Sequence, residues 1–175
     1  MRRRLLAPLL LVVLPGCPLL EVEVDAPEVR LTYPGVAVPA GDAAPRIQST
    51  FTFDDLSPIQ ELGELDAGVA FVRGEARIAS GLDDFSFVDA VTLSIASGDP
   101  ASTLAPLTLY ACDGDCPVDG ASLDLPGDVE QAVLPYVTSG SIAITVELAG
   151  ALPAHPWTMD VDVYLTANGA YAAAP

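Results

Sequence analysis

The chain has 175 residues, with 24 acidic residues, seven arginines and no lysine, and its formal net charge is −17 at pH 7. Such an acidic chain lacks the dense basic patch that binding to nucleic acid or to an anionic membrane surface requires. We therefore expect cations, basic proteins or neutral glycans as partners, and no nucleic acid. The length suffices for one domain with a sizeable buried core.

The first residues combine a positive flank with a short apolar run. Arg2, Arg3 and Arg4 precede about ten apolar residues, Leu5 to Leu14. This order is typical of an export signal. The run is too short to span a bilayer, which needs about twenty residues.

Leu14-Pro15-Gly16-Cys17 ends this segment, and here the chain resembles the signal peptides of bacterial lipoproteins. Leu14, Gly16 and Cys17 match the usual lipobox, whereas Pro15 departs from its preference for a small residue. The resemblance implies that residues 1–16 are removed and that Cys17 becomes an acylated first residue. Several acyl chains anchor a protein to a membrane far more firmly than one does.

The same resemblance implies a location and a domain plan. Pro18 is not the aspartate that commonly retains such proteins at the inner membrane, so we expect an outer-membrane lipoprotein that faces either the periplasm or the cell surface. Residues 17–27 would form the lipidated tether and a first strand, and residues 28–175 the folded domain. The chain after residue 17 holds four arginines against 24 acidic residues, a net charge of −20.

Strand-like alternation begins soon after the leader. Apolar side chains occupy even positions from residue 20 to 24 and odd positions from residue 29 to 33, with Pro27 between the two runs. A period of two indicates a half-buried strand, and a proline at the change of register favours a bend or bulge in an edge strand. We expect a loop from Pro34 to Pro45.

The rest of the chain alternates between apolar runs and turns. One strand changes its facing at Gly74, which predicts a bulge there. Short helices are expected from Ser57-Pro58 and from Asp128 until Pro135 breaks the second one. Residues 149–156 should join the last two strands as a hairpin. Strands are predicted at 46–54, 69–79, 85–95, 107–112, 121–125, 142–148 and 157–165.

Some eight strands without a long helical pattern predict an all-β fold. The turn residues between the strands favour a single antiparallel β-sandwich, of jelly-roll or immunoglobulin-like type, with one or two short helical turns.

Two cysteines remain once Cys17 carries lipid. Cys112 and Cys116 flank Asp113-Gly114-Asp115, and an exported chain meets an oxidising compartment, so we predict a disulfide between them. The alternatives are a thiol redox pair or a zinc site. Zinc needs more ligands than His155, the single histidine, can add, and the spacing differs from that of thioredoxin-like motifs.

The acidic loop around these cysteines is a candidate calcium site. Asp113, Asp115 and Asp119 place hard oxygen ligands on alternate residues. Their spacing does not fit an EF-hand, and the simpler interpretation is a set of solvated turn acids. The pairs Asp83 with Asp84 and Asp160 with Asp162 are expected to be solvated in the same way.

No catalytic constellation is recognisable in the sequence. His155 is expected in a loop, and Trp157 has the parity of a core residue. No G-x-S-x-G nucleophile motif occurs. We expect a non-catalytic, lipid-anchored envelope protein that binds a protein or glycan ligand or has a structural role. The alternative is an envelope hydrolase or lipid-handling domain on the same strands.

Overall fold

The computed structural model describes residues 21–25, 28–40, 46–51, 56, 68–127 and 132–172. These residues form two antiparallel sheets and the four-residue helix α2 (Leu134–Val137), and Leu56 is also helical. The strands are β1 (Glu21–Asp25), β2 (Val29–Val38), β3 (Arg46–Phe51), β4 (Gly68–Ser80), β5 (Val88–Ser97), β6 (Leu107–Asp113), β7 (Val118–Asp119), β8 (Ser122–Pro126), β9 (Ile142–Gly150) and β10 (Trp157–Ala172).

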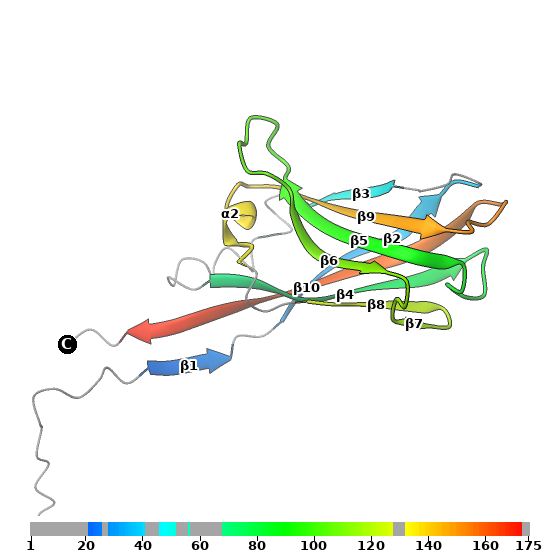
Figure 1. Cartoon of the computed structure of the whole chain (residues 1–175). Helices are drawn as coiled ribbons and strands as arrows, with labels where there is room; N and C mark the ends of the chain where they lie inside the picture. The colour runs from blue at the N-terminus through cyan, green and yellow to red at the C-terminus, as the bar shows by residue number, and fades with distance from the viewer. Residues whose placement is uncertain are drawn as a thin grey trace, which may run out of the picture.

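The order of the strands is that of a jelly roll. Sheet A contains β2-β10-β4-β8, extended by β1 beside β10 and by β7 beside β8, and sheet B contains β3-β9-β5-β6. When the short strands β1 and β7 are set aside, the first and last strands pair, β2 with β10, and the pairs β3 with β9, β4 with β8 and β5 with β6 follow inward. The chain is thus one long antiparallel ribbon rolled into two sheets, and the predicted β-sandwich is confirmed (Figure 1).

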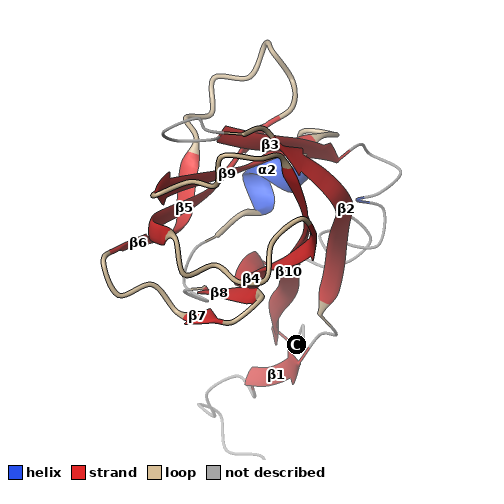
Figure 2. Cartoon of the chain, turned by 90° about the vertical axis from the view of Figure 1, so that its right-hand side faces the viewer, coloured by secondary structure: helices blue, strands red, loops and turns tan. Residues whose placement is uncertain are grey.

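The strand directions define two ends of the sandwich. At one end, called here the β1 end, β4 and β9 start, β5 finishes, and α2 lies close by (Figure 1). At the opposite end, called here the far end, β5 and β10 start and β6 finishes. Seen from the far end, the two sheets face each other and α2 lies behind them (Figure 2).

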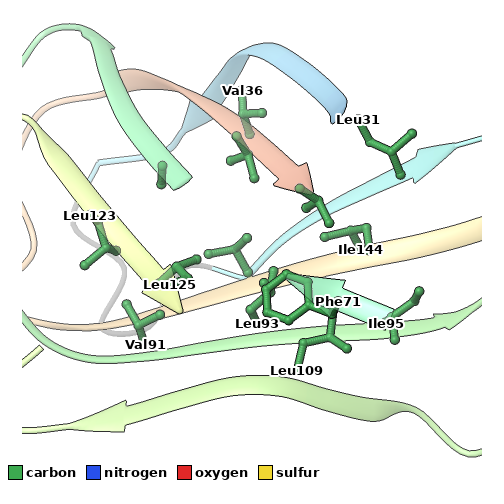
Figure 3. Close-up of a cluster of buried hydrophobic side chains, with 14 of the residues drawn as sticks. Leu31, Val36, Phe71, Val91, Leu93, Ile95, Leu109, Leu123, Leu125 and Ile144 are labelled. Carbon is green, nitrogen blue, oxygen red and sulfur yellow. The ribbon is translucent and has the colours of Figure 1, made fainter. Parts of the chain in front are cut away.

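Apolar side chains from both sheets fill the space between them. Phe71 of sheet A and Leu93 and Ile95 of sheet B are fully buried, and Leu123 and Leu125 close the core on the β8 side (Figure 3). Inward positions alternate with outward ones along most of β5 and along β10 from Trp157 to Leu165, as the period of two predicts. The burial of these large side chains supplies the main driving force for folding.

The N-terminal strand is interrupted as predicted, but it continues further. Between the pairs Asp25–Asn168 and Val29–Leu165 the N-terminal chain has one more residue than β10, so the expected change of register is confirmed, although Pro27 itself lies outside the described residues. The predicted loop from Pro34 is wrong up to Val38. β2 passes Pro34 through an irregularity at which Gly35, with φ 66°, donates its N–H to Asp160 Oδ1 at 2.8 Å.

The set of β4 residues that points into the core changes parity two residues before the site predicted from the sequence, Gly74. The register against β10 shifts between the Arg73 and Phe71 pairs, which leaves Val72 as the extra residue. Gly74 instead faces the core, where an added Cβ would lie 3.1 Å from Leu93 Cδ2. Close packing against sheet B, rather than a bulge, therefore accounts for this glycine.

Three further sequence predictions are corrected. β5 starts at Val88, so the predicted strand from Phe85 was too long at its start. Pro135 lies in the first turn of α2 and does not break it, since proline lacks only an N–H that is unpaired there in any case. The last two strands form no hairpin, because β9 belongs to sheet B and β10 to sheet A. The helix expected at Ser57 and the cap at Asp128 lie outside the described residues.

Candidate functional site

The outward face of sheet A carries a group of charged side chains in its middle. Odd-numbered residues of β10 from Trp157 to Leu165 point into the core, so even-numbered ones face outward. Three of the four arginines that follow residue 17 lie on this face. The group, called here the Asp162 cluster, comprises Arg30 of β2, Asp162 and Tyr164 of β10, and Arg73, Glu75 and Arg77 of β4.

Asp162 is at the centre of the cluster and is 1% exposed. Arg30 Nη2 and Arg77 Nη2 both donate to its Oδ2, at 2.5 and 2.6 Å. Its other oxygen, Oδ1, is buried and has no hydrogen-bond partner among the described residues. The prediction that Asp162 is solvated is therefore wrong, because long side chains from the strands on both sides cover it.

These arginines also set the ionisation of the carboxyl group. Burial by itself raises the pKa of Asp162, but interactions with Arg30, Thr32 and Arg77 lower it by more, so its pKa lies below the ordinary value. The hydrogen bond to Asp162 in turn raises the pKa of Arg30 and of Arg77. The cluster therefore holds ionised groups at neutral pH.

Arg73 extends the cluster along the sheet toward the β1 end. Its guanidinium carbon lies 3.6 Å from the centre of the Tyr164 ring, which is a cation–π contact. The same side chain reaches Glu28, just before β2, with an N···O distance of 3.5 Å. Side chains from three neighbouring strands thus interlock at the point where the N-terminal strand joins the sheet. These contacts indicate that the cluster helps to hold β2, β10 and β4 together.

Replacing Asp162 with asparagine tests this role. The change leaves two guanidinium groups without their shared carboxylate, so we expect it to lower the free energy of unfolding by about 1–3 kcal/mol, measured by urea denaturation at pH 7. Asp124→Asn is the matched control on the same face, and because Asp124 is exposed it should change stability by less than about 0.5 kcal/mol. Equal effects of the two changes would contradict the role.

The lowered pKa of Asp162 predicts a pH dependence for the same comparison. A carboxyl group whose pKa falls on folding stabilises the protein above its unfolded pKa, about 4, and loses this contribution as the pH falls through the folded pKa. The stability difference between wild type and Asp162→Asn should thus stay constant from pH 7 to 5 and shrink below about pH 4. A difference that grows toward pH 3 would refute the assignment.

The two cysteines lie where the chain crosses from one sheet to the other at the far end. Cys112 is in β6 of sheet B and Cys116 precedes β7 of sheet A. Their sulfur atoms are at disulfide distance, 2.18 Å, with the Cα atoms 5.5 Å apart. Gly114, with φ 98°, turns the chain between them and donates its N–H to Asp89 O at 2.8 Å. The pair therefore pins a crossover that glycine makes tight.

Loss of this cross-link should have a limited effect on stability. Loop-closure entropy for a loop of about five residues corresponds to about 2 kcal/mol. We expect the double change Cys112→Ser, Cys116→Ser to lower the free energy of unfolding by this amount or less, in urea titrations under oxidising conditions. The addition of a dithiol reductant should bring the wild type to the value of the variant and leave the variant unchanged. A wild type that is insensitive to the reductant would show that the bond does not form.

The structure does not bring the candidate calcium ligands together. Asp113, Asp115 and Asp119 are all exposed. Within the described ranges, no three His, Cys, Asp or Glu side chains gather closely enough to hold a metal ion. Calcium binding remains a prediction from the sequence.

His155, in the loop at 151–156, and Trp157, the first residue of β10, lie at the far end. His155 is exposed, with Nε2 2.8 Å from the carbonyl oxygen of Gly81. Trp157 is 3% exposed and makes edge contacts with Phe85 and Phe87, at 5.8 and 5.7 Å between ring centres. The prediction that Trp157 points into the core is confirmed, and the three aromatic rings close the sandwich at this end.

Cys17 and the residues up to 20 lie outside the described part of the chain. None of the helical segments in the described part has the length and apolar character needed to cross a bilayer.

No family model matches the chain, and no curated protein matches it. Solved structures that are similar to the chain include viral ones. Desmodium yellow mottle tymovirus has 11% identity and a TM-score of 0.29 over 96% of this chain and 98% of that one. The structure of turnip yellow mosaic virus has 14% identity and a TM-score of 0.31, over 97% of this chain and 92% of that one. The Nora virus structure has 16% identity and a TM-score of 0.31, over 93% of this chain and 66% of that one. Scores this low carry no argument, so the jelly-roll assignment rests on the strand order alone.

Proposed function

We propose that the protein is a non-catalytic lipoprotein of the bacterial cell envelope, a jelly roll displayed on a lipid tether. The observation that carries the proposal is the leader, Arg2–Arg4 followed by an apolar run that ends at Leu14-Pro15-Gly16-Cys17. The position of the first strand supports it. Three residues separate Cys17 from the start of β1, which pairs with β10, so a lipid on Cys17 would hold the folded body by a short segment.

The features of the described residues suit a structural or binding role. The charged groups in the Asp162 cluster neutralise one another and hold strands together. The disulfide and the aromatic contacts fix the loops at the far end. Rigid loops on a β-sandwich are a common way to present a binding surface. Proteins or glycans are the ligand classes we propose, and Pro18 supports placement at the outer membrane.

Replacing Cys17 with serine tests the anchor. Without an acylated cysteine, the protein should move from the membrane fraction to the soluble fraction or remain as an unprocessed precursor, because the acyl chains supply the membrane affinity. Fractionation and intact-mass measurement of the N-terminus check this outcome. The Cys112→Ser, Cys116→Ser variant keeps Cys17 and serves as the matched control that should stay in the membrane fraction.

The opposite result would refute the proposal. If wild-type protein purified from membranes began at Met1 with an unmodified Cys17, the leader would not be a lipoprotein signal. Equal membrane retention of the Cys17→Ser variant and the wild type would show that something other than lipid holds the protein.

A further inference from the structure

The start of the folded body is fixed at one end of sheet A. The five residues of β1 pair with residues 168–172 of β10, whereas β2 and β4 pair with β10 only up to Leu165 and Asn168. β1 and the last part of β10 therefore form a two-stranded ribbon that projects from the sandwich (Figure 1). At about 3.4 Å per residue the ribbon is about 17 Å long.

The chain before this ribbon is short. Three residues separate Cys17 from Glu21, and this segment spans at most about 14 Å when fully extended. The part of β10 that lies in the sandwich, from Asn168 to Trp157, runs for about 37 Å in the opposite direction. The far end is therefore beyond the reach of the tether unless the whole body lies flat on the bilayer.

Two features oppose an arrangement in which the body lies flat on the bilayer or in which β2 detaches from sheet A. A net charge of −20 after Cys17 disfavours broad contact with an anionic bilayer surface. The tether also cannot lengthen easily by release of β2, because Glu28 and Arg30 at the start of that strand are bound to Arg73 and Asp162. The ion pairs of the Asp162 cluster thus keep the attachment point at the β1 end.

We propose that the β1 end faces the bilayer that holds the acyl chains of Cys17, and that the far end points away from it into the aqueous space. The inference rests on the lipid anchor proposed above. It assigns the bilayer as the neighbour of the end that carries α2. It leaves the loops at 81–87, 113–117 and 151–156 as the part of the body that other molecules meet.

Energy transfer to the membrane tests the orientation in the full-length, lipidated protein. With Cys17 acylated and Cys112–Cys116 oxidised, an introduced cysteine is the free thiol for labelling. Ala132, which bridges to Ala70 near the β1 end, and Ala154, in the far-end loop, are both exposed and give the matched variants Ala132→Cys and Ala154→Cys. Each is labelled with a donor dye and inserted into vesicles of phosphatidylcholine and anionic phosphatidylglycerol that carry an acceptor lipid.

We expect transfer from the label at 132 to exceed that from the label at 154 by at least about twofold, given the length of the sandwich. Equal transfer from the two sites while both proteins float with the vesicles would overturn the orientation and leave the anchor intact. Transfer that is stronger from 154 would do the same. Failure of the acylated wild type to float with vesicles would overturn the proposed function together with the orientation.

Discussion

The pairing of β10 on both of its sides is the constraint on which the other features depend. β10 lies between β2 and β4 in sheet A, so most of its middle pairs with a strand on each side, with register shifts near Asp160 and Tyr164. Its alternation sends Met159, Val161 and Val163 into the core. The same alternation sends Asp162 to the outer face, where it becomes buried because both neighbouring strands supply arginines. A charged group can therefore be enclosed on the outside of a sheet without entering the apolar core.

The sequence predicted well what depends on local alternation. The start of the strand at Trp157 was located correctly, although β10 continues past the predicted end at Leu165 to Ala172. The disulfide pair followed from the count of cysteines. In β9 the same alternation places Ala143 and Thr145 opposite the apolar side chains, yet both are buried. β9 lies between two other strands, and a local sequence pattern does not show which strands will be its neighbours. The bulge in β4 was also misplaced, because Gly74, the residue that suggested it, instead allows close packing in the core.

Contacts between distant residues explain most of what could not be predicted. Asp162 is 132 residues from Arg30 and 85 from Arg77, and only the rolled topology brings them together. The sequence pattern places Asp162, Arg30 and Arg77 on the outward sides of three predicted strands. This signal indicates an ion-pair cluster only when the strand order is known. The assignment of β9 and β10 to different sheets was missed for the same reason, because two strands adjacent in sequence usually pair.

The ribbon of β1 and the last residues of β10 places the two ends of the folded chain side by side. Domains with adjacent termini tolerate circular permutation, and a new opening in the exposed loop at 151–156 would keep the rolled strand order. An affinity handle or a fused reporter attached after Ala172 would sit beside the lipid-bearing segment and be crowded by it. The loop at 151–156 is therefore the better place for a graft.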